Sequence, residues 1–221
     1  VWDLRIGVLT ILKKWKRHLQ PELIHWETTD YIKQVFNTPE IKKGSTRLYI
    51  NSRFLPSAEL INSIENLKIG ESLYYEDILV AQHSDRAIDY NPINIKKLDF
   101  KPIFIEFLWD MLELNSAQIS ADISLFRISS KSKQAIADTI ITNKDNMYIS
   151  DSATIEPGVI LMADKGPIFI GDDAAIEAGS IIKGPAAICR GATVKMSARI
   201  YDSTTIGPHC KVGGEVSHSI F

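Results

Sequence analysis

An aliphatic residue recurs at every sixth position through the last quarter of the chain. The series consists of Ile170, Ile176, Ile182, Ile188, Val194, Ile200, Ile206 and Val212, and Ile149, Ile155 and Leu161 extend it upstream. Four positions after each member from Ile170 onward comes a small or compact residue, namely Ala174, Ser180, Ala186, Ala192, Ala198, Thr204, Cys210 and Val216. This period matches neither the 3.6 residues of an amphipathic helix nor the alternation of a half-buried strand.

A period of six predicts one side of a triangular coil, in which a short strand is followed by a turn. Three such sides make one coil, and successive coils stack at about 4.8 Å, the usual spacing of paired strands. The aliphatic residues are expected to fill the interior, and the small residues to point inward near the corners. Extra residues between Met162 and Phe169 are expected to form a loop at one corner. The pattern therefore predicts a parallel β-helix, but no chemistry, because a fold does not imply a function.

Residues 4–19 place apolar side chains at helical spacing and predict an amphipathic helix. A basic cluster covers its other face, formed by Lys13, Lys14, Lys16 and Arg17. We interpret this cluster as a solvated helix face, with a phosphate-attracting surface as the alternative.

Further elements are predicted between residues 47 and 126. A strand is expected at 47–51, a helix at 57–67 with Ser57 as its N-cap, and a hairpin at 72–82. An apolar helix is expected at 102–114 and a second helix at 116–126. This mixture of helices and strands predicts an α/β domain ahead of the β-helix.

Composition changes near residue 147 and suggests where the domains meet. All four tryptophans lie before this point, and nine of the twelve glycines lie after it. The segment 128–146 is rich in Ser, Lys, Asn and Asp. We therefore predict an α/β domain at 1–127, a linker at 128–146 and the β-helix at 147–221.

Composition and charge exclude several classes of protein. The 221 residues are 45% hydrophobic and carry a net charge of -2, which is typical of a globular protein and argues against a dedicated nucleic-acid binder. No apolar run approaches the roughly 20 residues of a membrane span, and no signal pattern is present. Two cysteines, Cys189 and Cys210, suggest a reducing compartment, so we expect a cytoplasmic location. Neither a glycine-rich phosphate loop nor a zinc-site spacing occurs.

Several strings resemble one family in both halves of the chain. They are DLRIGVLTILKKW (3–15), YINSRFLP (49–56), LWDMLELN (108–115), GPIFIGDDAAIEAGSIIKGPAAI (166–188) and VKMSARIYDSTTIGPHCKVGGEVSHSIF (194–221). They resemble the short bacterial form of the bifunctional UDP-N-acetylglucosamine pyrophosphorylase and glucosamine-1-phosphate acetyltransferase family. In that family a sugar-1-phosphate nucleotidyltransferase is fused to a hexapeptide-repeat acyltransferase. The hexapeptide half is a left-handed parallel β-helix that usually forms trimers.

The resemblance implies a pair of reactions. The N-terminal half would join a sugar phosphate to a nucleoside triphosphate and release pyrophosphate, a reaction in which Mg²⁺ and basic side chains normally neutralise phosphate charge. The β-helix would transfer an acetyl group from acetyl-CoA to an amino-sugar phosphate, in a cleft between neighbouring subunits of a homotrimer. The implied partners are therefore small molecules and further copies of the chain.

The departures from the family concern both sites. The family's triphosphate-binding loop is expected before Val1, and the histidine base of its acetyltransferase in a coil after Phe221, so we expect both ends to continue in a longer protein. Where longer relatives carry a metal-binding Asn-Gly-Asp turn, this chain has Asn51, Ser52 and Arg53. An arginine cannot ligate Mg²⁺ but can contact phosphate directly, so metal use at this turn is in doubt.

The two histidines of the β-helix half do not match the position of the family's base. His209 falls at a turn position of its hexad and is expected to be an exposed corner residue. His218 falls in an ambiguous register. The residues themselves therefore supply no assigned catalytic group, and no metal site is expected.

Six residues are our candidates for substrate binding. Arg5 and Arg53 are candidate phosphate contacts, Asn51 a candidate for a sugar or base, and Asp110 a candidate acidic site residue. The alternatives are a helix-surface charge for Arg5, a strand end for Asn51 and an interdomain salt bridge for Asp110. Lys195 and Tyr201 are placed on outward turns of the β-helix, where they would face an acyl-CoA cleft or simply solvent.

Two other functions remain as alternatives to this pair of transferase activities. One is a non-catalytic β-helix protein that trimerises and binds a nucleotide sugar, which Arg53 and the expected missing loop favour. The other is a β-helix carbonic anhydrase with metal between subunits. That enzyme needs three histidines across the coils, and this half of the chain has two.

Overall fold

The computed structural model describes residues 1–25, 27–29, 32, 34, 45–129 and 138–221. The chain packs as two compact units. Unit 1 consists of Val1 and Leu12–Ile105, and unit 2 of Trp2–Ile11 and Glu106–Phe221. The N-terminal segment therefore packs with the C-terminal half, although composition placed it in the first domain. Within the described part of the chain, no helix has the length and apolar character needed to cross a bilayer.

Unit 1 contains a mixed sheet with the strand order β3-β5-β4-β6. Its strands are β3 (Arg47–Ile50), β4 (Glu71–Tyr75), β5 (Ile78–Ser84) and β6 (Asn94–Lys97). β5 pairs antiparallel with β3 and β4, whereas β6 runs parallel to β4. The expected strand and hairpin are confirmed.

Helix α3 (Ala58–Glu65) begins where its sequence predicts. The Ser57 hydroxyl accepts a hydrogen bond from the amide of Leu60 at 3.2 Å, which satisfies one of the free donors of the first turn. Leu60 and Ile64, one turn apart, are buried. The expected helix and its cap are confirmed.

The helix expected at 4–19 is shorter in the structure. Helix α1 spans Ile11–Leu19, and β1 (Arg5–Ile6) and β2 (Leu9–Thr10) form an antiparallel hairpin before it. The prediction of a helix over residues 4–10 is wrong, because Gly7 has a φ of +72° and turns the chain back. Arg5 is therefore a strand residue and not a helix-surface charge.

The basic face of α1 also differs from its prediction. Lys13, Lys16 and Arg17 are exposed, but Lys14 is only 1% exposed. Residues three and four apart share one helix face, so Lys14 lies beside Ile11, which is also buried. The solvated face therefore excludes Lys14.

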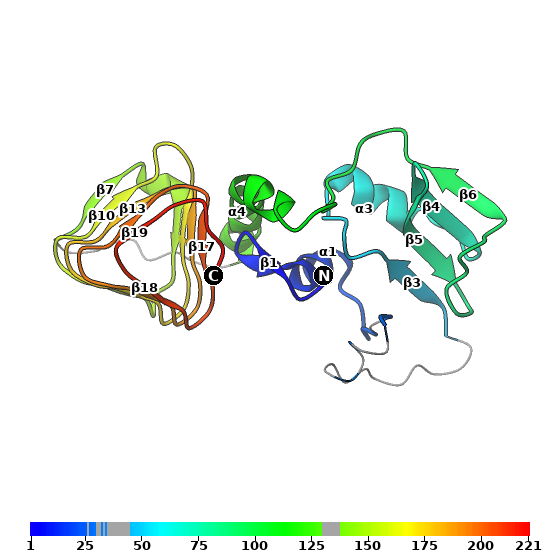
Figure 1. The fold of residues 1–221 in the computed structure, drawn as a ribbon, viewed down its shortest axis with the longest axis horizontal. Helices are drawn as coiled ribbons and strands as arrows, with labels where there is room; N and C mark the ends of the chain where they lie inside the picture. Colours follow the sequence, from blue (N-terminus) through cyan, green and yellow to red (C-terminus); the bar gives the residue numbers. More distant parts are fainter. Residues whose placement is uncertain (26, 30–31, 33, 35–44, 130–137) are drawn as a thin grey trace. The chain divides into compact units, whose positions relative to one another are not determined.

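Unit 2 contains the predicted prism. In the part of the chain that the structure describes, its sides are three parallel sheets (Figure 1). The first side consists of β7 (Ile140–Thr142), β10 (Ile160–Met162), β13 (Ile181–Lys183), β16 (Arg199–Ile200) and β19 (Glu215–Val216). The second consists of β8 (Met147–Ile149), β11 (Ile168–Ile170), β14 (Ala186–Ile188) and β17 (Thr204–Ile206). The third consists of β9 (Thr154–Ile155), β12 (Ala175–Ile176), β15 (Thr193–Val194) and β18 (Lys211–Val212).

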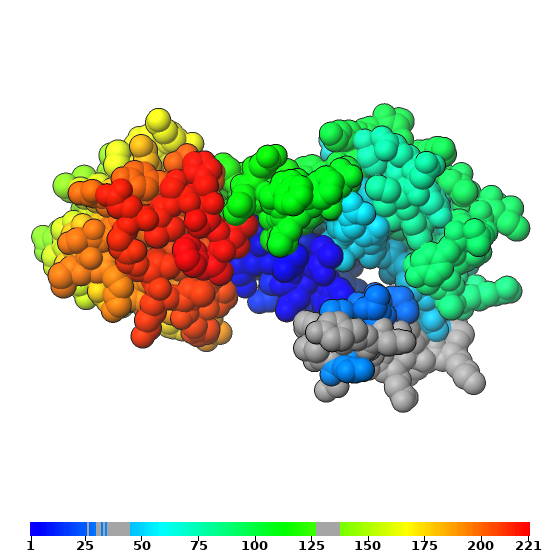
Figure 2. Space-filling model, in the orientation of Figure 1, coloured from blue at the N-terminus to red at the C-terminus, as the bar shows by residue number. Residues whose placement is uncertain are grey.

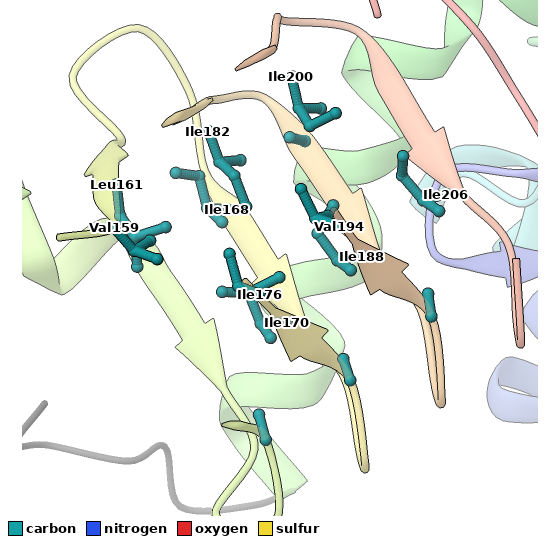
Figure 3. Packing of buried hydrophobic residues seen from close by; sticks show 14 of the residues in the cluster. Val159, Leu161, Ile168, Ile170, Ile176, Ile182, Ile188, Val194, Ile200 and Ile206 are labelled. Carbon is teal, nitrogen blue, oxygen red and sulfur yellow. The ribbon is translucent and has the colours of Figure 1, made fainter. Parts of the chain in front are cut away.

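The aliphatic series fills the prism as the hexad pattern predicts (Figure 3). Ile170, Ile188 and Ile206 stack in register on the second side and are fully buried. The small residue at Ser180 also points inward, and its hydroxyl donates to the carbonyl of Lys195 at 2.9 Å. The expected corner loop lies between β10 and β11. The fold is thus an α/β region followed by a parallel β-helix of hexapeptide repeats.

The last coil departs from the period of six. Val216 pairs with Ile200 and so occupies the aliphatic row, where the pattern assigned it to the row of small residues. This assignment is wrong because the coil between these two residues is shorter than the preceding ones. Gly214 permits the tighter turn with a φ of +75°.

One long helix, α4 (Asp110–Ser129), replaces the two helices expected at 102–114 and 116–126. Its first residue holds the turn ahead of the helix, since Asp110 Oδ2 accepts hydrogen bonds from the amides of Glu106 and Phe107 at 2.9 and 2.8 Å. Further upstream, Ile103 and Ile105 make backbone hydrogen bonds with residues 55 and 53 of unit 1.

The segment expected as a linker, 128–146, contains parts of three elements. α4 continues to Ser129, β7 begins at Ile140, and a 3₁₀ turn, η1, spans Lys144–Asn146. β7 pairs with β10 and is therefore the first strand of the prism. Residues 130–137 lie outside the described part of the chain.

Candidate functional site

The second side of the prism carries a column of outward residues that are buried instead of exposed. Tyr148, Phe169, Ala187 and Thr205 occupy equivalent positions on its successive strands. Helix α4 covers this side, as Figure 1 shows for unit 2. We call it the covered face.

Aromatic packing joins α4 to the covered face at its first coils. The Phe126 ring lies 4.8 Å from Phe169 and 5.6 Å from Tyr148, centroid to centroid. Ile119 and Ile123 belong to the same buried cluster. Further along the column the residues become smaller and then polar, through Ala187 to Thr205, so the contact changes from apolar packing to hydrogen bonding.

The turn Gly7–Leu9, which we call the N-terminal turn, is held at the polar end of this column. The amide of Gly7 donates to Asn115 Oδ1 at 2.8 Å. The amides of Val8 and Leu9 donate to Asp122 Oδ2 at 2.8 and 3.0 Å. Asn115 and Asp122 project from α4 and are almost completely buried.

Only glycine fits the first position of this turn. A Cβ at residue 7 would lie 2.7 Å from the backbone of Gln118 and from Asp122 Oδ2, closer than real Cβ contacts. Its positive φ adds backbone strain for any other residue. The turn can therefore approach α4 closely enough for its amides to bond to the helix side chains.

Figure 2 shows the blue N-terminal segment packed against green α4 and the red last coil within unit 2.

Arg5 lies on β1 with part of its guanidinium bound within unit 2. Its Nη1 donates to the carbonyl of Val8 and lies 3.8 Å from the Cys189 sulfur. Among the residues that the structure describes, Nε and Nη2 of Arg5 have no hydrogen-bond partner. These N–H groups remain available for an anion.

Burial raises the pKa of the Cys189 thiol from 9.0 to about 11, and the nearby Arg5 guanidinium opposes this rise. Desolvation disfavours the thiolate, so Cys189 is a neutral thiol at physiological pH. Both cysteines are free thiols.

A pocket of about 590 Å³ opens beside Arg5 in unit 2. We call it the Arg5 pocket, and it is lined by Asp3, Leu4, Arg5, Leu108, Trp109, Met111, Leu112, Ile220 and Phe221. Its volume is within the usual range for small-molecule sites, and its lining is mainly apolar with a few polar groups. The Trp109 side chain is 61% exposed and stacks on Phe107 at 4.7 Å, which fixes the orientation of its ring.

The candidates Asn51 and Arg53 lie in one turn of unit 1, and both are used within it. Asn51 Oδ1 accepts the amide of Arg53 at 3.1 Å, and its Nδ2 donates to the carbonyl of Leu79 at 2.9 Å. Arg53 Nε donates to the carbonyl of Ile105 at 2.9 Å, and its guanidinium lies over the Phe104 ring. These contacts hold the turn itself.

The turn does not fit a magnesium ion. It offers no carboxylate, and the one side-chain amide oxygen, on Asn51, already accepts a backbone hydrogen bond. Within the described ranges, no group of three or more His, Cys, Asp or Glu side chains is arranged to hold a metal. We therefore derive no catalytic step through a metal at this turn.

The remaining candidates are dispersed over unit 2. Asp110 holds the turn of residues 106 and 107 ahead of α4, as described above. Lys195 forms an ion pair with Glu177 at 2.7 Å on the prism surface, and Tyr201 is half-buried on the first side of the last coils. His209 is exposed at a corner with a φ of +61°, as its turn position predicted.

Sequence reasoning missed Asn115, Asp122 and Thr205, which hold the N-terminal turn. The first two are polar residues of α4 that are almost completely buried, and such residues are buried only with partners. Thr205 is an outward position, on which the period of six places no constraint. The sequence signal was therefore weak, because Gln118 is a third buried polar residue of the same helix.

Unit 2 thus joins a hexapeptide β-helix to an N-terminal turn and a pocket that contains an arginine. The sequence matches the family model for sugar nucleotidyl transferases over residues 1–131, which is more than half of the chain. The chain therefore belongs to the sugar nucleotidyl transferase family. No curated protein matches it.

Proposed function

We propose that the chain acts in nucleotide-sugar synthesis, joining a sugar 1-phosphate to a nucleoside triphosphate. An oxygen of the sugar phosphate attacks the α-phosphorus, the bond between the α-phosphorus and the bridging oxygen breaks, and pyrophosphate leaves. Such reactions depend chiefly on positioning and on cationic groups around the phosphates. The observation that carries this proposal is the family match over residues 1–131.

The Arg5 pocket supports this function as a site for the phosphate-bearing substrate. The free N–H groups of Arg5 suit a phosphate, which a guanidinium binds with paired hydrogen bonds. The flat, exposed ring of Trp109 suits a nucleobase or a sugar face. Asn51, Arg53 and Asp110 are already engaged locally, so Arg5 becomes our principal candidate for binding.

For the prism we propose acetyl transfer that leads to a product such as UDP-N-acetylglucosamine. The amine of an amino-sugar phosphate attacks the thioester carbonyl of acetyl-CoA, the carbon–sulfur bond breaks, and the ammonium proton passes to a general base. The hexad architecture and the sequence resemblance support this part of the proposal. They also favour a homotrimer, with Lys195 and Tyr201 facing the acyl-CoA cleft, in a cytoplasmic enzyme.

The test is an assay for pyrophosphate release from UTP with a panel of sugar 1-phosphates, and for free thiol release from acetyl-CoA. We expect pyrophosphate release by the wild type, a loss of at least tenfold in Arg5→Ala, and partial recovery in Arg5→Lys. Arg190→Ala is the matched control, because Arg190 is an exposed residue of the same unit paired with Asp173.

Absence of pyrophosphate release with every sugar phosphate would contradict the nucleotidyltransferase proposal. Tight calorimetric binding of UDP-N-acetylglucosamine without turnover would instead support the alternative, a non-catalytic protein that binds a nucleotide sugar. Thiol release alone would restrict the activity to the prism.

A further inference from the structure

The hydrogen bonds that hold the N-terminal turn continue from α4 into the prism. The Thr205 hydroxyl lies 3.1 Å from both the carbonyl oxygen of Gly7 and Asn115 Oδ1, and donates its one proton between them. Asn115 Nδ2 donates to the carbonyl of Ser203 at 2.8 Å. Asn115, Asp122 and Thr205 together form what we call the clamp.

Every member of the clamp is buried, so its hydrogen bonds are protected from competition by water. Thr205 and Asn115 are 0% exposed, and Asp122 is 1% exposed. A buried donor or acceptor that loses its partner cannot bond to water instead, so its loss is costly, and more so when the group is charged. The clamp therefore fixes the N-terminal turn in one position much more firmly than apolar packing alone would.

The clamp is connected to the Arg5 pocket through the backbone of the N-terminal turn. Asp122 accepts a hydrogen bond from the amide of Val8, and the carbonyl of Val8 accepts one from the Arg5 guanidinium. The orientation of Arg5 thus depends on where the clamp holds Val8. On the other side, Cys189 of the prism contacts the same Arg5 nitrogen.

The hydroxyl of Thr205 is not needed to fill the covered face. The equivalent positions on the preceding strands are apolar, as Phe169 and Ala187 show. A valine has nearly the shape of threonine and would pack in the same place, but it would offer no proton to Gly7 O. Among the described residues, the hydroxyl bonds to the Gly7 carbonyl and to Asn115 Oδ1.

We propose that Thr205 is a positioning residue for nucleotidyl transfer, which acts by holding the N-terminal turn and thereby orienting Arg5 in its pocket. This inference rests on the proposed function. It extends that function beyond the family match, because Thr205 lies on β17 of the prism, outside residues 1–131. The prism is then part of the nucleotidyltransferase site and not only a second domain.

The experiment measures kcat and KM for nucleotidyl transfer in Thr205→Val, Thr205→Ser and a control, Thr193→Val. Thr193 lies on β15, on the third side of the prism, away from the clamp. We expect the KM for the phosphate substrate that Arg5 binds to rise about tenfold in Thr205→Val, with kcat changed less than threefold. Thr205→Ser should restore the wild-type KM, and Thr193→Val should leave it unchanged.

Adding Arg5→Ala to Thr205→Val separates positioning from a general loss of stability. If Thr205 acts through Arg5, the second substitution adds nothing to the KM already raised by Arg5→Ala. An unchanged KM in Thr205→Val, or a rise of equal size on the Arg5→Ala background, would overturn the inference. An inactive wild type would instead overturn the proposed function, so the two failures are distinguishable.

Discussion

The interior and the covered face of the prism are made from the same strands but follow different rules. On β14, Ile188 points inward and Ala187 outward, and both are fully buried. Ile188 is buried because every coil places an aliphatic residue at that position. Ala187 is buried because α4 and the N-terminal turn cover it. The repeat therefore determines the shape of the prism, whereas the outward positions determine what binds to it.

The largest expected effect comes from the interior. Ile176→Ala removes a fully buried side chain from the centre of the stacked row and leaves a cavity, so we expect the free energy of unfolding of unit 2 to fall by about 4 kcal/mol. Denaturant unfolding measures this change. Ile181→Ala, at a half-buried position of β13, is the control and should cost much less. Equal losses at both sites would contradict the distinction between inward and outward positions.

The next effect concerns the covered face. Gly7→Ala should destabilise unit 2 by about 3 kcal/mol, because it combines a positive φ with a clash against the backbone of Gln118. Gly214→Ala is a matched control, since Gly214 also has a positive φ but its added Cβ would contact nothing within 4 Å. The control should cost only about 1 kcal/mol. A Gly7 variant as stable as the Gly214 variant would show that the turn does not need its close approach to α4.

Burial also makes the free energy of unfolding depend on pH through Cys189. The unfolded thiol loses its proton near pH 9, whereas the folded thiol keeps its proton until about pH 11. Between these values the unfolded state binds fewer protons, so the free energy of unfolding falls as the pH rises, by about 2 to 3 kcal/mol around pH 11. Denaturant unfolding of the wild type and of Cys189→Ala from pH 8 to 11 measures this slope. The difference between the two curves isolates Cys189, and parallel curves would contradict its burial beside Arg5.

The smallest effect is expected on the uncovered surface of the prism. The pKa of Glu177 is lowered chiefly by its hydrogen bond to Lys195 and also by the amide of Met196. The stability that this carboxylate contributes is present above its ordinary pKa of 4.5 and is lost as the pH falls through the lowered value. Because the pair is exposed to solvent, Glu177→Gln should not change thermal unfolding measurably at pH 7. A large destabilisation at pH 7 would mean that this surface is covered in solution.

The same comparison explains which parts of the fold could be predicted from the sequence. The interior rows were predictable because eleven hexads repeat one rule, and only Val216, after a shortened coil, breaks it. The local signals at Ser57 and in the hairpin of β4 and β5 also sufficed. Residues 4–10 were misassigned because helical spacing and a glycine turn compete there, and the partners that favour the turn lie more than a hundred positions away.

The candidate site was less predictable for the same physical reason. Arg5 and Asp110 lie on matching strings, but the contact of Arg5 with Cys189 joins residues 184 positions apart, which no local pattern indicates. The residues of the clamp come from α4 and β17, and their polar side chains show no common period. Lys14 likewise becomes buried through its position beside Ile11, which a basic cluster in the sequence does not indicate.

Hydrogen exchange of the N-terminal turn tests the central claim most directly, namely that this turn belongs to the prism unit through the clamp. We expect the amides of Val8 and Leu9 to exchange as slowly as those of β14. In Asp122→Ala they should exchange at least tenfold faster, while the amides of β12 inside the prism remain protected. Rapid exchange of Val8 and Leu9 in the wild type, or unchanged protection in Asp122→Ala, would contradict the claim.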